Sequence, residues 1–72
     1  MTTINKAPLF DSNITELKTT YAFDQVVFAR TNDYYIYFEG LKSGVIVEIR
    51  YNIQEQKYEK SDYSKWSPLM TT

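Results

Sequence analysis

The chain has no cysteine and no histidine, so it can form neither a disulfide nor a Cys/His zinc site. Without histidine it also lacks the side chain that most often moves protons near neutral pH. It holds two glycines, and no glycine-rich loop that would cradle a phosphate. Carboxylate pairs such as Glu48 with Glu59 or Asp24 with Glu39 could meet in space, but surface carboxylates are more often solvated. We therefore expect no enzyme, no metal site and no cofactor.

Strong charge and long apolar runs are missing as well. The net charge of −1 and the pI near 5.2 give no overall field that favours nucleic acid or an anionic membrane. No apolar run approaches the ~20 residues that cross a bilayer, and the first residues lack the charged-then-apolar pattern of a secretion signal. These features predict a cytoplasmic protein with no membrane contact.

Aromatic residues are abundant instead. Seven tyrosines, four phenylalanines and one tryptophan make up 17% of the 72 residues. A chain of this length forms one domain and buries only about 60% of its unfolded surface. Dense aromatic packing or self-association is then needed for stability. We predict one domain over residues 1–72 with its core in 10–66, and a flexible or peripheral arm at 1–9, where Pro8 disfavours a helix.

The segment 12–19 predicts a short helix, with a strand as the alternative. Ser12 or Asn13 could cap it, and Glu16 stands three residues after Asn13, as in a capping box. The threonines of this segment are mediocre helix formers. Apolar residues at helical spacing would form one face of it: Ile14, Leu17 and Tyr21.

The segment 34–51 predicts a β-hairpin. Apolar and polar residues alternate with a period of two on both sides of Gly40, which is typical of strands with one buried face. A four-residue loop over 40–43 fixes the register, because a slip of one residue would reverse the faces. This register pairs Phe38 with Val45, Ile36 with Val47 and Tyr34 with Ile49 on the inner face, and Tyr37 with Ile46 and Asp33 with Arg50 on the outer face.

Two further strands are expected to flank this hairpin. A strand at about 21–30 would reach it through a three-residue loop with Asn32 or Asp33 in the left-handed region. That connection directs Val26 and Phe28 inward, and Val27 and Ala29 outward.

After the hairpin, a loop over 53–56 predicts Tyr51 opposite Tyr58 and Arg50 opposite Glu59. The following strand at 57–60 should fray beyond Ser61, because the run to Lys65 is mostly polar. Trp66 and Leu69 could fold the tail back onto the sheet. The predicted fold is therefore mainly β or small α+β, a three- to four-stranded antiparallel meander with one short N-terminal helix.

The outer face of this sheet is the strongest candidate site. It carries Val27, Tyr35, Tyr37 and Ile46, which form a second small core if something covers them and a protein-binding patch if nothing does. One short helix can cover one face only. We therefore predict a non-catalytic protein-binding module, such as a stoichiometric inhibitor or adaptor, for example a phage-encoded antagonist of a host protein.

Two alternatives remain. Interleaved bases and aromatics at the C-terminal end suit a small β-barrel-like protein that binds single-stranded nucleic acid, because rings stack on bases and cations pair with phosphates. The second alternative is a self-associating structural subunit such as a homodimer. The candidate nucleic-acid residues are Arg50, Lys57, Tyr58, Lys60, Tyr63, Lys65 and Trp66.

Overall fold

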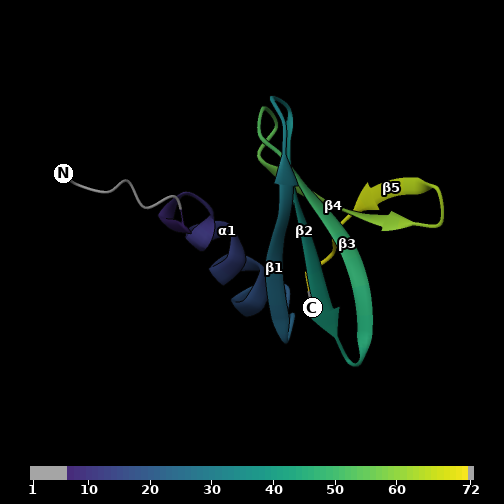
Figure 1. Cartoon of the computed structure of the whole chain (residues 1–72). Coiled ribbons are helices and arrows are strands. Elements are labelled where there is room, and N and C mark those ends of the chain that lie inside the picture. Colours follow the sequence, from purple (N-terminus) through teal and green to yellow (C-terminus); the bar gives the residue numbers. More distant parts are fainter. Residues whose placement is uncertain (1–6, 72) are drawn as a thin grey trace.

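Residues 7–71 form one helix packed on one five-stranded antiparallel sheet (Figure 1). A computed structural model describes residues 7–71, and side chains from residue 10 onward. The strands follow the order of the chain across the sheet. This confirms the predicted α+β meander and adds a fifth strand. The elements are α1 (Ala7–Thr19), β1 (Gln25–Thr31), β2 (Tyr35–Lys42), β3 (Val45–Asn52), β4 (Lys57–Asp62) and β5 (Lys65–Pro68).

The helix begins earlier than its sequence suggests. Pro8 lies in its first turn, where proline is tolerated because the missing N–H would have no acceptor within the helix. Residues 7–9 of the predicted arm are therefore helical, and residues 1–6 lie outside the described part of the chain. Asn13 and Glu16 stand inside the helix, so the predicted capping box is wrong.

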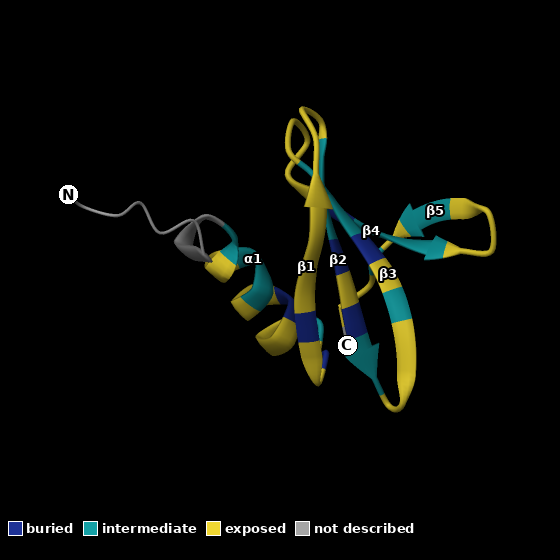
Figure 2. Cartoon of the chain, viewed as in Figure 1, coloured by how far each residue is buried: buried dark blue, intermediate teal, exposed yellow. Residues whose placement is uncertain are grey.

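The core lies between α1 and the inner face of the sheet. Leu17 is fully buried, as its helical spacing predicted, and so are Phe38 of β2 and Ile49 of β3. In Figure 1 the helix lies beside β1 on one side of the sheet, and Figure 2 shows exposed residues over much of β1 and β3. The buried apolar residues are Leu17, Phe23, Val26, Phe38, Ile49 and Tyr58.

The β2–β3 hairpin closes through a two-residue turn at Ser43 and Gly44, so the predicted four-residue loop is wrong. Both residues have positive φ, 52° and 80°, as a type I′ turn requires. Phe38 consequently pairs with Ile49, and Arg50 pairs with Tyr37 rather than Asp33. The partner of each residue is thus displaced by four residues from the predicted register, and this even number preserves the inner and outer faces because side chains alternate.

The connection from β1 to β2 spans residues 32–34, one position later than predicted. Neither Asn32 nor Asp33 has positive φ. The Asn32 side chain stabilises the turn instead, because its Oδ1 accepts hydrogen bonds from the backbone N–H groups of Tyr34 and Tyr35 at 2.8 and 2.9 Å. Tyr34 lies in this loop and is exposed, so its predicted inner position is wrong.

A bulge at Ala29 changes the end of β1. Phe28 pairs with Phe38, and the next pair is Arg30 with Tyr37. Val26 and Phe28 face inward as predicted. The extra residue turns Arg30 onto the outer face, because a bulge shifts the alternation by one position.

The C-terminal strands extend further than predicted. Tyr51 pairs with Tyr58 and Arg50 with Glu59, as the loop over 53–56 predicted. The fraying beyond Ser61 is wrong, because Ser61 pairs with Trp66 in β5. The tail does return to the sheet, where the backbone N–H of Leu69 donates to the carbonyl of Tyr58 at 3.1 Å.

Candidate protein-binding face

The outer face of the sheet is the face opposite α1, and all four predicted residues lie on it. They do not form one patch, however. Tyr37 pairs with Arg50, whereas Ile46 pairs with Leu41, four residues further along β2. The predicted neighbourhood of Tyr37 and Ile46 is therefore wrong. The face divides into an aromatic half and an open half.

The aromatic half is built around Arg50. Its guanidinium lies 4.1 Å from the centre of the Tyr35 ring and 4.3 Å from that of Trp66. Its Nε donates to Oε1 of Glu59 at 2.5 Å. This packing fixes the guanidinium between two rings and a carboxylate, which favours its charged form.

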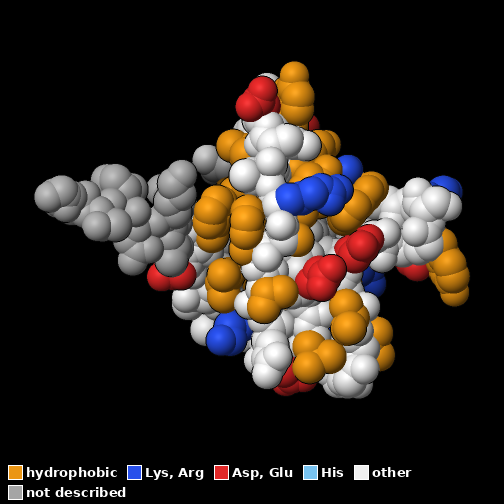
Figure 3. All heavy atoms as spheres, in the orientation of Figure 1, with side chains coloured by type: hydrophobic (Ala, Val, Ile, Leu, Met, Phe, Trp, Pro, Cys, Tyr) orange, Lys and Arg blue, Asp and Glu red, His pale blue; other side chains and the backbone are white. Residues whose placement is uncertain are grey.

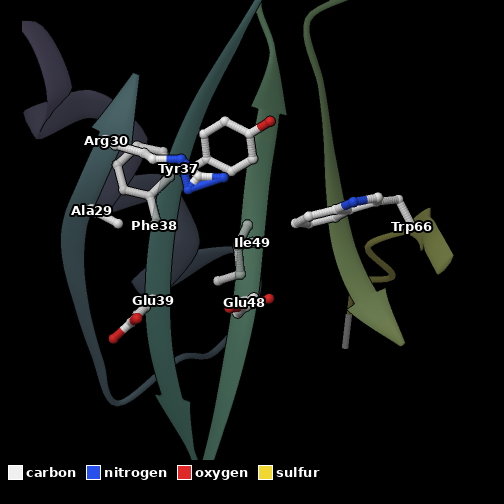
Figure 4. Close-up of a pocket in the computed structure, with 8 residues that line it drawn as sticks. All are labelled: Ala29, Arg30, Tyr37, Phe38, Glu39, Glu48, Ile49 and Trp66. Carbon is white, nitrogen blue, oxygen red and sulfur yellow. The ribbon is translucent and has the colours of Figure 1, made fainter. Parts of the chain in front are cut away.

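Tyr37 completes this half. Its ring lies 3.9 Å from the Arg30 guanidinium and 6.0 Å from the Trp66 ring, measured to ring centres. Figure 4 shows Arg30 against Tyr37 from one side and Trp66 reaching in from the other. Tyr35 and Tyr37 are half-buried. The chain's own arginines and tryptophan thus cover these two rings in part.

The open half begins at a pair of carboxylates. Glu39 and Glu48 are directly opposite each other on β2 and β3, and both are exposed. Like charges in such positions destabilise a sheet. Among the residues that the structure describes, neither has a lysine or arginine nitrogen within salt-bridge distance. Figure 4 shows them next to Tyr37 and Ile49 on the same two strands.

Aliphatic side chains complete the open half. Val27 is 56% exposed and Ile46 is 70% exposed, and Leu41 between them is half-buried. A shallow hollow of about 180 Å³ lies among Val27, Leu41, Ile46 and Glu39. In the space-filling view, acidic and hydrophobic side chains lie side by side over the sheet (Figure 3). We define the open half as Val27, Glu39, Leu41, Ile46 and Glu48.

The seven candidate nucleic-acid residues are not brought together. Arg50 and Trp66 share the outer face, but Tyr58 is buried under the helix. Lys60 pairs with Ile49 on the inner side, and Lys65 with Asp62 at the end of β4. Lys57 lies 3.8 Å from Glu55, and Tyr63 is fully exposed in the β4–β5 turn. A continuous track of bases and rings is absent from this part of the structure.

A polar contact holds α1 on the inner face. The Tyr58 hydroxyl accepts a hydrogen bond from Nδ2 of Asn13 at 2.9 Å and donates one to Oε1 of Glu16 at 3.0 Å. Burial raises the pKa of this hydroxyl, and the Glu16 carboxylate raises it further, against the opposing effect of Asn13. Two side chains one helical turn apart thus bind one strand residue, which orients the helix toward the inner face.

Sequence reasoning placed Glu39 and Glu48 on the outer face but did not pair them with each other, and it missed Arg30 and Leu41 as members of this face. A two-residue turn at Ser43–Gly44 would have placed Glu39 opposite Glu48, and Leu41 opposite Ile46. In the structure Glu39 lies opposite Glu48. The carboxylate pairs considered from the sequence were Glu48 with Glu59 and Asp24 with Glu39. Arg30 needed the bulge at Ala29, for which the sequence carries no distinct signal.

The described residues include no group of three or more aspartates or glutamates that could hold a metal ion. No helix in residues 7–71 is both long and apolar enough to cross a membrane. Comparisons of the chain with family models, curated proteins and solved structures returned no match.

Proposed function

We propose that the protein is a non-catalytic protein-binding module whose outer sheet face meets the partner. The observation that supports this most is the one-sided cover of the sheet. The helix packs on the inner face, while Val27 and Ile46 are more than half exposed on the other. Exposed aliphatic residues beside charged ones are typical of protein interfaces.

The aromatic half supports the same proposal. Arg50, Tyr35 and Trp66 hold one another in place, so the border of the open half is rigid before binding. Binding then costs less free energy, because these side chains do not have to be ordered when the partner binds. Tyrosine, tryptophan and arginine are also the residues that most often dominate binding free energies.

A single small domain with one such face suits one-to-one binding. We therefore favour an intracellular stoichiometric inhibitor or adaptor over a self-associating subunit. A phage-encoded antagonist of a host protein remains one example of this class.

Affinity capture from a lysate of the cells that make the protein tests the proposal. The wild type, a Val27→Ser, Ile46→Ser double variant and a Val45→Ser control are used as baits. Val45 is a matched control because it is 60% exposed but lies on the inner side of the hairpin end. We expect the double variant to lose a protein that the wild type and the control both retain, as measured by quantitative mass spectrometry.

Two outcomes would contradict the proposal. Equal capture by all three baits would move the binding site away from the outer face. Recovery of nucleic acid that is lost at high salt, with no dominant protein, would favour the nucleic-acid alternative.

A further inference from the structure

We propose that the open half binds a protein segment that presents a lysine or arginine beside an aliphatic residue. This inference rests on the proposed function and specifies the chemistry of the partner. The partner's cation would lie between Glu39 and Glu48, and its aliphatic side chain would fill the hollow beside Glu39. The segment would lie across β2 and β3 on the outer face.

The charge argument starts from the carboxylate pair. Glu39 and Glu48 are cross-strand neighbours, so their Cβ atoms are about 5 Å apart. Among residues 10–71 neither carboxylate forms an ion pair, since the ion pairs there are Arg50 with Glu59 and Lys57 with Glu55. A cation from outside would relieve the mutual repulsion of the two carboxylates and gain attraction from both. A neutral or acidic partner would leave the repulsion in place.

The neighbouring arginines of the chain do not already form ion pairs with Glu39 and Glu48. Arg50 is held by Glu59 and by the Tyr35 and Trp66 rings, and the Arg30 guanidinium lies over Tyr37. Both guanidiniums therefore belong to the aromatic half. The open half keeps a net negative charge next to exposed aliphatic surface.

The hollow indicates which side chain the partner would place beside its cation. It is about 180 Å³ in volume, and its lining is mostly apolar: Val27, Gly40, Leu41 and Ile46, with Gln25 and Glu39. This lining suits an aliphatic side chain, which would cover the exposed surface of Val27 and Ile46. Glu39 also lines a smaller hollow with Glu48, Tyr37, Trp66 and Arg30, where the Arg30 guanidinium lies over the Tyr37 ring. The cation and the aliphatic group would therefore bind next to each other.

A second copy of the chain fits this surface less well. Two open halves placed face to face would bring both carboxylate pairs together. Arg30 is stacked on Tyr37, and Arg50 is held by Glu59 and two rings. Charge complementarity therefore favours a different, basic protein segment, and nucleic acid would be repelled by the same carboxylates.

A peptide titration followed by NMR tests the inference. The ¹⁵N-labelled full chain is titrated with a short extended peptide that has a central arginine flanked by leucines. A second peptide replaces the arginine with citrulline, which keeps the shape and removes the charge. We expect the arginine peptide to shift the amide signals of Glu39, Leu41, Ile46 and Glu48. We expect the citrulline peptide to bind about fivefold more weakly, because a partly exposed ion pair contributes up to about 1 kcal/mol.

Protein variants assign the selectivity to the two carboxylates. A Glu39→Gln, Glu48→Gln double variant should bind both peptides equally, whereas Glu55→Gln, which alters an exposed loop carboxylate, should keep the preference for arginine. Added salt should reduce the preference as well, because it screens exposed charges.

Several results would overturn the inference. Equal binding of the two peptides at the open half would reject charge selectivity while leaving the proposed protein-binding face intact. Shifts elsewhere, or none at about 5 mM peptide, would reject this peptide chemistry, and the lysate capture would then decide the proposed function separately. Shifts of the open half that depend on protein concentration alone would identify a second copy. Shifts caused by an oligothymidine strand would identify nucleic acid.

Discussion

The Arg50 guanidinium lies 4.3 Å from the centre of the Trp66 ring, although β4 separates the strands that carry these residues. Trp66 therefore reaches across a whole strand to contact Arg50 and Tyr37. This contact ties the C-terminal hairpin to the middle of the sheet. It also closes the aromatic half of the outer face, and the open half stays accessible.

Arg50→Lys should destabilise the protein by about 0.5–2 kcal/mol, because a lysine ammonium cannot stack in a plane between two rings. Urea unfolding followed by the emission of the chain's single tryptophan measures both stability and the exposure of Trp66. Lys57→Gln is the control: its partner is the exposed Glu55 at 3.8 Å, and exposed pairs contribute little. Equal unfolding midpoints for all three proteins would contradict the role given to Arg50.

Gly40→Ala should destabilise the protein by about 1–3 kcal/mol through overpacking. A Cβ at this position would lie 2.6 Å from Cδ1 of Phe23 and 2.9 Å from Cδ1 of Ile49, both in the core. Phe23→Leu replaces the ring with a smaller side chain and should restore part of the stability that Gly40→Ala loses. A double-mutant cycle of the two changes should therefore give a coupling free energy of about 0.5–3 kcal/mol. Additive effects in thermal unfolding would show that these groups do not meet.

Leu17→Ala should cost about 2–5 kcal/mol, since it removes a fully buried side chain between helix and sheet. In a domain whose total stability is about 5–15 kcal/mol, this loss should lower the urea midpoint strongly. Ile46→Ala removes a similar aliphatic volume from an exposed site and should change stability by less than about 0.5 kcal/mol. If Ile46→Ala were the more destabilising, Ile46 would belong to a core and not to a binding face.

The pKa of the Tyr58 hydroxyl is raised by burial and by Glu16, which predicts a pH dependence of stability. An unfolded tyrosine ionises near about pH 10. Above that pH the unfolded chain loses a proton that folded Tyr58 keeps, so stability falls as pH rises, and below it the contribution is fully present.

Tyr58→Phe should flatten the alkaline part of the stability curve and cost about 1–3 kcal/mol at neutral pH, because two hydrogen bonds are lost. Tyr63→Phe is the matched control, as Tyr63 is fully exposed. Urea unfolding at several pH values from 7 to about 11 compares the three proteins. An unchanged slope in Tyr58→Phe would place the alkaline sensitivity elsewhere.

Alternation along the chain predicted which residues face inward, and those faces are confirmed for both strands of the β2–β3 hairpin. It could not determine the register, since displacing one strand along the other by an even number of residues, here four, leaves every face unchanged. The register of the hairpin depends on which of the two glycines makes the turn. Gly44 does so with a φ of 80°, while Gly40 is a glycine because Phe23 and Ile49 fill the space of a Cβ.

The structural features that the sequence did not predict depend mostly on contacts between residues that are distant in the chain. β5 has a polar sequence, and it is held by pairing with β4 and by the contacts of Trp66 with Arg50 and Tyr37. The start of the helix was missed because Pro8 disfavours a helix interior and yet is compatible with a first turn. The position of Arg30 follows from a bulge that local propensity does not indicate.

The binding role of the outer face is tested most directly by methyl cross-saturation NMR with the captured partner. Signals of Val27, Ile46 and Val45 methyl groups are measured in the labelled protein while the unlabelled partner is irradiated. We predict that Val27 and Ile46 lose intensity and that Val45, exposed on the inner side of the hairpin end, keeps it. Loss at Val45 with no loss at Val27 and Ile46, or no captured protein at all, would contradict the proposal.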